Sequence, residues 1–125
     1  MIDKIFGEVS FKTGWCKNEY LNLFGKQFTV IVRAKSYRDT DFITDLQRDE
    51  YQAFSKNKNF IEKEIENLLI NYKGKDFLKN LLPRFLIFKR GGGYALLLDD
   101  KTNPDNGLAI VLSPKKEVMT QDDYL

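Results

Sequence analysis

Apolar and polar residues alternate in the first third of the chain. One set of alternate positions is apolar or small and the other set is polar, with Phe6 the exception: Ile5, Gly7, Val9, Phe11 against Lys4, Glu8, Ser10, Lys12. A period of two predicts a half-buried strand over residues 5–12. A turn at Thr13-Gly14 precedes a second strand at 15–24, and the β-branched segment 27–34 predicts a third. We expect these three strands to form an antiparallel meander.

The spacing of apolar residues becomes helical after Thr40. Two faces emerge, the first formed by Ile43, Leu46, Glu50 and Phe54, the second by Ile61, Ile65, Leu68, Leu69 and Tyr72. A polar segment at 55–59 separates them, and Asn59 followed by Glu62 resembles a capping box. The pattern therefore predicts two helices, at 41–55 and 60–73, with the second ending at Gly74.

The last third is again typical of strands. Pro83 is expected to stop a short helical fragment at 76–82, because proline breaks a helix. Three apolar runs follow, at 84–89, 94–98 and 108–112, and both of their faces are apolar, as in strands covered on both sides. The chain is thus expected to form one α+β domain over residues 1–125. Its mostly antiparallel sheet would have about six strands, in the order β-β-β-α-α-β-β-β, with the helical pair packed on one face.

The glycines at Gly91–Gly93 invite comparison with phosphate-binding and RNA-binding loops. A phosphate-binding P-loop needs Lys and Ser/Thr directly after its last glycine and then a helix, whereas Tyr94 and a strand follow here. The match to an RNA-recognition strand is partial, because Gly92 occupies a position where an aromatic would stack on a base. We interpret the glycines as a hairpin connection that requires positive φ angles.

Acidic residues occur in three places where a metal or acid-base site must be weighed. A calcium loop starting at Asp99 would need Glu at its twelfth residue, which is Ile110, so residues 99–107 are interpreted as a hairpin turn around Pro104 and Gly107. A weak acidic patch of Asp99, Asp100 and Asp105 stays open. Two further groups have structural explanations, in the helix dipole for Asp39, Asp41 and Asp45 and in a solvated helix flank for Glu62 and Glu66.

Composition removes several classes of chemistry. The chain has no histidine, which excludes Ser-His-Asp and Cys-His catalysis and the usual zinc sites. Cys16 is the only cysteine, so it cannot form an intramolecular disulfide and is expected to be a small buried residue. The first twelve residues lack the apolar stretch of a signal peptide. We therefore expect a cytoplasmic protein that is not an enzyme and that has no cofactor and no metal.

Several short sequence features follow one another along the chain in a recognisable order. They are Phe6-Gly7, Trp15, Phe24-Gly25 before "VIV", Gln47 with Tyr51 and Phe54, Leu82-Pro83, and "YALLLDD" followed by "DNGLAIVL". In this order the chain resembles a family of small, stand-alone bacterial domains of unknown function. The resemblance covers nearly the whole chain. It implies an interaction protein, in particular a toxin-immunity protein, and it implies no catalytic residues.

The expected function is therefore binding to another protein. Aromatic and basic side chains near two predicted turns are the candidate contact residues: Arg33, Tyr37, Arg38, Lys89, Arg90 and Tyr94. The alternative is weak binding of RNA or single-stranded DNA by the basic amino-terminal third, where Arg33, Lys35 and Arg38 lie near Tyr37, with Lys89 and Arg90 as further candidates. The net charge of +2 is small for a nucleic-acid binder, which makes a protein partner the first expectation.

Overall fold

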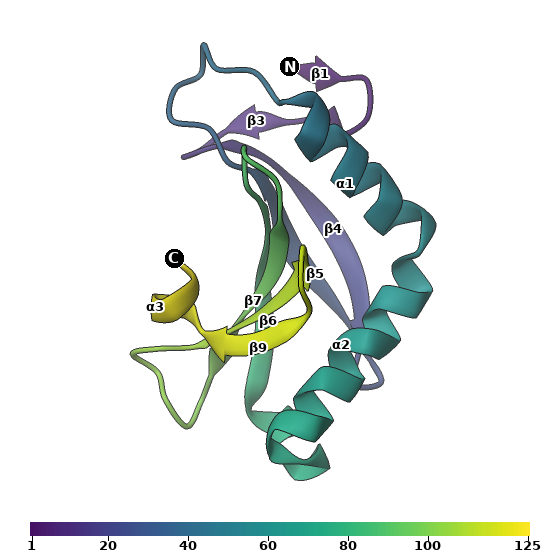
Figure 1. Cartoon of the computed structure of the whole chain (residues 1–125), viewed down its shortest axis with the longest axis vertical. Helices are drawn as coiled ribbons and strands as arrows, with labels where there is room; N and C mark the ends of the chain where they lie inside the picture. The colour runs from purple at the N-terminus through teal and green to yellow at the C-terminus, as the bar shows by residue number, and fades with distance from the viewer.

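The sheet runs through the middle of the molecule, and a pair of helices covers one of its faces (Figure 1). The computed structural model describes all residues from 1 to 125. The sheet has seven strands in the order β3-β4-β5-β6-β7-β8-β9. Their bounds are β3 Ser10–Phe11, β4 Trp15–Leu23, β5 Lys26–Ala34, β6 Leu81–Phe88, β7 Tyr94–Asp100, β8 Leu108–Ser113 and β9 Glu117–Thr120. The predicted α+β class with a mostly antiparallel sheet is confirmed.

The remaining elements are short except for the helical pair. They comprise the two-stranded ribbon of β1 (Ile2–Asp3) and β2 (Gly7–Glu8), the helices α1 (Asp45–Lys56) and α2 (Lys58–Lys73), the 3-10 helix η1 (Lys75–Asn80) and the terminal helix α3 (Gln121–Tyr124). No helix of the chain has the length and apolar character needed to cross a membrane.

One strand pair differs from all the others. β5 and β6 are parallel, with Ile31 opposite Phe85 and Ala34 opposite Phe88, whereas every other neighbouring pair is antiparallel. The crossover between them consists of α1, α2 and η1, since parallel neighbours cannot be joined by a tight turn. The sheet is therefore two antiparallel meanders joined at this pair, and the carboxyl ends of β5 and β6 lie at the same edge.

A capping box begins the first helix, whereas the sequence predicted one at the start of the second. The Thr44 hydroxyl accepts from the Gln47 backbone N–H at 3.1 Å, and the Gln47 side chain accepts from the Thr44 N–H at 2.9 Å. The predicted box at Asn59 and Glu62 is wrong, because α2 begins directly after Asn57, whose side chain makes no cap bond. Gly74, with φ of 91°, ends α2 as predicted.

The buried face of α2 follows the prediction, and that of α1 does not. Ile61, Ile65 and Leu69 are buried, with Leu68 partly buried beside them, while Tyr72 is exposed. In α1 the buried residues are Gln47, Tyr51 and Phe54. Because the buried positions 47, 51 and 54 define the inward face, Leu46 and Glu50 lie to one side of it, and the predicted face is wrong there.

Aromatic rings dominate the core between the helices and the sheet. Phe6 stacks on Tyr51 with ring centroids 4.3 Å apart, and Phe88 stacks on Tyr94 at 4.7 Å. The opposite face of the sheet carries a second, smaller cluster of Ile87, Leu97 and Ala109, against which Met119 and Tyr124 pack. Strands β6, β7 and β8 thus bury residues on both faces, as their apolar runs predicted.

Two expectations about strands need correction. The predicted strand at 5–12 is broken into β2 and β3, because Gly7 has φ of 78° and the Asp3 carboxylate accepts from the Ile5 and Phe6 N–H groups to make a turn. Pro83 does not stop a helix but lies inside β6, at a bulge where that strand pairs only with β7. The seventh strand, β9, was not predicted.

Candidate partner-binding surface and adjoining cleft

Two loops meet at the edge where β5 and β6 end. Residues 35–44 follow β5 and residues 89–93 follow β6, and the Lys35 N–H donates to the Phe88 carbonyl at 2.9 Å. The fully buried Gln47 side chain donates to the carbonyls of both Lys35 and Phe88, at 3.0 Å each. Both polar atoms of the buried Gln47 side chain are therefore paired, and the bases of the two loops are fixed to α1 and to each other.

Large side chains project into solvent from these loops and from the first turn of α1. Tyr37 is 86% exposed, Phe42 62% and Leu46 45%. Arg90 donates from Nη1 to the Phe42 carbonyl at 3.0 Å, and Arg38 extends into solvent with its Nε 3.6 Å from Asp41. We call Tyr37, Arg38, Phe42, Leu46 and Arg90 the loop patch. Aromatic and arginine side chains are enriched among the residues that contribute most to protein binding.

The glycine loop turns the chain, as predicted, and also binds a carboxylate of the protein, that of Glu50. Phe88 pairs with Tyr94 across the hairpin, and Gly92 and Gly93 have φ angles of 98° and 95°. The Gly93 N–H donates to the Glu50 carboxylate at 2.9 Å. This contact joins the loop to the middle of α1.

The six residues predicted as contacts do not form one surface. Tyr37, Arg38 and Arg90 lie in the loop patch. Arg33 and Lys89 instead face the side of the sheet opposite the helical pair, where the Arg33 guanidinium is 4.9 Å from the Phe85 ring centroid and Lys89 Nζ is 4.0 Å from that of Tyr124. Tyr94 lies on the helix side, within the main core.

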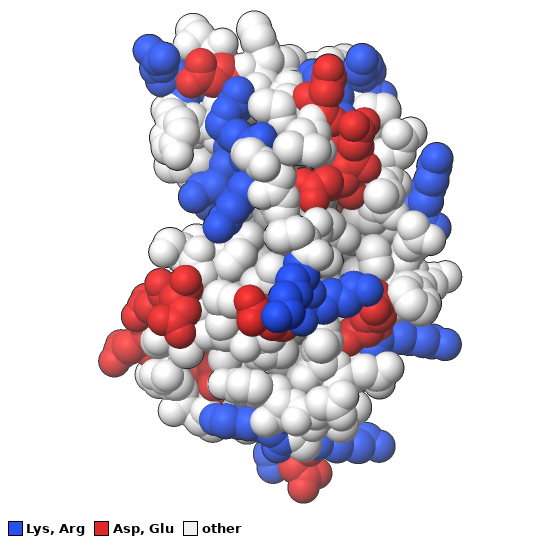
Figure 2. Space-filling model, viewed as in Figure 1, with Lys and Arg blue, Asp and Glu red and all other residues white.

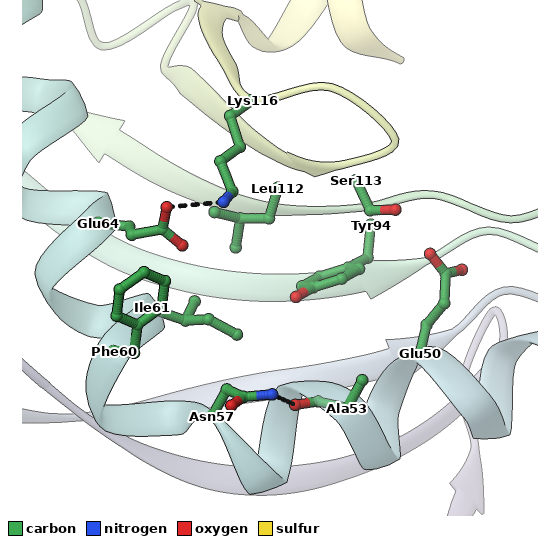
Figure 3. Close-up of a pocket in the computed structure, with 10 residues that line it drawn as sticks. All are labelled: Glu50, Ala53, Asn57, Phe60, Ile61, Glu64, Tyr94, Leu112, Ser113 and Lys116. Atoms are coloured by element: carbon green, nitrogen blue, oxygen red, sulfur yellow. Dashed lines mark hydrogen bonds and ion pairs between the residues drawn. The ribbon is translucent and has the colours of Figure 1, made fainter.

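A cleft of about 470 Å³ opens between the helical pair and strands β7 and β8 (Figure 3). Tyr94 lies in it, with Glu50 drawn at one end of the cleft and Glu64 and Lys116 at the other. Lys116 Nζ is 2.6 Å from Glu64 Oε2. Burial, together with the negative charges of Glu50 and Glu64, raises the pKa of Tyr94 to about 12.

The acidic groups weighed in the sequence have separate structural roles. Glu62 is buried and accepts from the Asn22 N–H at 2.6 Å, and Glu66 accepts from the Phe24 N–H at 3.1 Å. The expected solvated flank is therefore wrong, since these carboxylates pair with N–H groups on the outer edge of β4 and beyond its end. Of the three aspartates assigned to the helix dipole, only Asp45 lies in the first turn of α1, whereas Asp39 and Asp41 precede the helix, so the prediction is wrong for those two.

The acidic turn at 99–107 is a hairpin between β7 and β8, as interpreted. Asp100 is buried and accepts from the Thr102 N–H and hydroxyl, while Asp99 faces Arg84 at 3.6 Å. The chain gathers no group of three or more Asp, Glu or Cys side chains that could hold a metal ion. Cys16 is buried, with its thiol 3.5 Å from the Lys12 carbonyl.

Charges of both signs are distributed in separate clusters over the face seen in Figure 2, and no continuous basic stripe crosses that face. Comparison of the chain with family models, with curated proteins and with solved structures finds no match. The geometry of the loop patch and of the cleft therefore has to support any functional conclusion.

Proposed function

We propose that this protein is a non-catalytic protein-interaction module that binds its partner through the loop patch. The observation that carries the proposal is the exposure of Tyr37, Phe42 and Leu46 beside Arg38 and Arg90. Leu46 lies in the first turn of α1, and the others lie on loops whose bases are fixed by Gln47. Exposed apolar side chains gain free energy when a partner buries them. The neighbouring arginines supply directional hydrogen bonds at the rim of such an interface.

The frame under the patch lowers the cost of binding. A loop that is disordered when free loses conformational entropy when a partner orders it, and this loss subtracts from the affinity. Here Ser36 donates from its hydroxyl to the Asp41 carbonyl at 2.7 Å, and Trp15 donates to the same carbonyl at 2.9 Å. These contacts hold the loop of residues 35–44 in one shape, so less entropy remains to be lost.

The resemblance to bacterial domains associated with toxin loci favours a toxin as the partner. Inhibitors of basic nucleases are commonly strongly acidic, since opposite charge speeds association. With a net charge of +2 and two arginines in the patch, this chain is better matched to a partner surface that carries carboxylates. The proposed toxin class is therefore one with an acidic contact surface.

The test is affinity capture from the native host with matched variants. A double variant, Tyr37→Ala with Phe42→Ala, is expected to lose a partner that the unchanged protein retains at stoichiometric yield, because truncating two such anchors costs about 2 kcal/mol or more each. Tyr72→Ala is the control, since Tyr72 is also an exposed aromatic but lies near the end of α2. Retention of the partner by the double variant would contradict the proposal.

The alternative, binding of RNA or single-stranded DNA, makes a different prediction. Arg33 and Lys89 lie over aromatic rings and Arg90 donates to carbonyls, so much of the basic charge already has partners within the chain. Binding driven by phosphates weakens steeply as salt rises. Retention on immobilised single strands at low salt, lost on addition of salt and lost in an Arg33→Gln, Lys89→Gln variant, would favour the alternative over the loop patch.

A further inference from the structure

The cleft of Figure 3 contains a tyrosine that is buried as a residue but whose hydroxyl has no partner in the protein. Tyr94 is only 7% exposed, and its hydroxyl points into the cleft with no hydrogen bond to any of the other residues that line it. The hydroxyl of a mostly buried tyrosine usually has a hydrogen-bond partner, so one that opens onto a cleft and has none in the protein offers a position for a ligand atom.

The charge of the cleft defines the sign of that ligand. Glu50 and Glu64 contribute two negative charges and Lys116 one positive charge, so the lining carries one negative charge in excess. Lys116 is about half exposed, with 48% of its side-chain surface accessible, which allows it to move away from Glu64. A tyrosine hydroxyl is neutral at neutral pH, and the raised pKa of Tyr94 only reinforces this, so its oxygen is free to accept a hydrogen bond from a cation.

The walls of the cleft suit the alkyl part of such a cation. Ile61 and Leu112 form apolar surface near the tyrosine ring, and Phe60, which is 63% exposed, stands beside Ile61 (Figure 3). Methylene groups pack well on such surfaces, and an ammonium or guanidinium group is attracted to aromatic faces. An anion would meet two carboxylates here, and a purely apolar group would leave the Tyr94 hydroxyl unpaired.

The cleft continues directly into the loop patch. Leu46, Glu50, Ala53 and Asn57 follow one another at i, i+4, i+7 and i+11, so they form a single stripe along α1 from the patch to the cleft. The Glu50 carboxylate also binds the Gly93 N–H of the loop that carries Arg90. A single partner is therefore able to contact the loop patch and the cleft together.

We propose that the cleft binds the ammonium or guanidinium group of a lysine or arginine side chain presented by the partner. The cation lies between the Tyr94 hydroxyl and Glu64, takes the place that Lys116 occupies in the free protein, and packs its methylene groups on Ile61 and Leu112. The inference rests on the proposed interaction function and adds the chemistry of one contact: a basic anchor in the cleft beside an acidic surface on the loop patch.

The experiment uses small probes and the folded full-length protein. Nα-acetyl-arginine amide and Nα-acetyl-lysine amide are titrated while backbone amide shifts are followed by NMR, with the neutral Nα-acetyl-citrulline amide as the matched probe. Shifts at Gly93, Tyr94 and Glu64 are expected with one or both cations and not with citrulline. Equal binding of citrulline, or no shift at these amides with either cation, would overturn the inference.

Three variants identify the groups that bind. Tyr94→Phe and Glu64→Gln are each expected to weaken cation binding about tenfold or more, the usual effect of losing a hydrogen bond to a charged group. Lys116→Met is expected to strengthen it, because the internal competitor is gone. Asp105→Asn removes the same charge as Glu64→Gln from an exposed turn and should leave the affinity unchanged. Unchanged affinity in Tyr94→Phe would also overturn the inference.

The two proposals fail in different experiments. If the cations bind in the cleft but Tyr37→Ala with Phe42→Ala retains the captured partner, the loop patch is wrong and the cleft stands as a cation site. If the double variant loses the partner and neither cation shifts the cleft amides, the loop patch stands and the basic anchor is wrong.

Discussion

The Arg48 guanidinium lies 2.7 Å from Asp3 through its Nη2 atom, and this ion pair ties the beginning of the chain to α1. Arg48 Nε donates to the same Asp3 oxygen at 2.8 Å, and the other carboxylate oxygen accepts from the Phe6 N–H at 2.9 Å. These bonds fix the turn after β1, and the turn places the Phe6 ring against Tyr51. The segment before β3 is thus part of the core.

Replacement of Asp3 by alanine is expected to lower the free energy of unfolding by about 3 kcal/mol, because it leaves Arg48 and two backbone N–H groups without their partner. Urea denaturation at neutral pH measures the change. Asp45→Ala is the control, since Asp45 contacts the same Arg48 at 3.0 Å but has a side chain that is 86% exposed, and its loss should have little effect. Equal destabilisation by the two variants would show that the Asp3 pair has no special role.

Acid is expected to weaken the same contact. Burial raises the pKa of Asp3, but hydrogen bonds from Arg48 and from the Phe6 and Ile5 N–H groups outweigh it and hold the pKa below the ordinary value of 3.8. The unfolded chain then binds a proton more readily, so this contribution is present above pH 3.8 and is lost as the pH falls through the lower native pKa. Below pH 3.8 the unchanged protein should lose stability more steeply than Asp3→Asn, which urea midpoints at successive pH values will measure.

Gln47→Leu is expected to destabilise the protein by roughly 2–3 kcal/mol, since it removes the capping box and the two side-chain hydrogen bonds that Gln47 donates to the Lys35 and Phe88 carbonyls. Hydrogen exchange provides a local measurement, because the Lys35 amide should exchange faster once the loop bases separate. Gln52→Leu replaces an exposed glutamine of the same helix and serves as the control. If Lys35 exchange is unaltered in Gln47→Leu, Gln47 does not hold the two loops.

The sequence predicts those parts of the fold that depend on local spacing. The stripe Ile61, Ile65 and Leu69 repeats at helical intervals, and each of these residues is buried. Gln47 could not be assigned to the core in this way, because polarity indicates surface until its distant partners, Lys35 and Phe88, are known. The parallel pairing of β5 with β6 is similarly invisible, since strand patterns specify faces but not neighbours.

The residues of the candidate site were likewise predictable from the sequence only in part. Tyr37, Arg38 and Arg90 were predicted as contacts because aromatic and basic residues stand near turns, and the structure brings them to one end of the sheet. Arg33 and Lys89 alternate onto the other face, which the strand period alone would have indicated. The cleft was missed because Glu50, Glu64, Tyr94 and Lys116 come from separate segments, and no short motif joins them.

Neighbouring leucines in α2 should respond very differently to truncation. Leu69 is fully buried, so Leu69→Ala is expected to cost about 3 kcal/mol through lost burial and the cavity left behind. Leu68 is only partly buried at the margin of the core, so Leu68→Ala should cost about 1 kcal/mol. Chemical denaturation of the two variants measures both, and a reversed order would mean that α2 presents a different face to the sheet.

The three consecutive glycines should not tolerate alanine equally. A Cβ at Gly93 would lie 3.0 Å from the Ser113 carbonyl oxygen, and its φ of 95° strains any other residue, so Gly93→Ala is expected to cost about 1–3 kcal/mol. Gly91 has open space around it and no positive φ, so Gly91→Ala should be neutral or slightly stabilising. Melting temperatures of the two variants test this, and equal values would place the strain elsewhere.

The parallel pair of β5 and β6 has a consequence for synthesis on the ribosome. The first meander leaves the ribosome with one edge of β5 unpaired. That edge stays unpaired until the crossover and β6 have been synthesised, because β6 follows both helices in the sequence. The nascent chain therefore passes through a stage in which an apolar strand lacks a hydrogen-bonded neighbour on one side. Pairing of β6 with β5 then joins the two meanders into one cooperatively folded sheet.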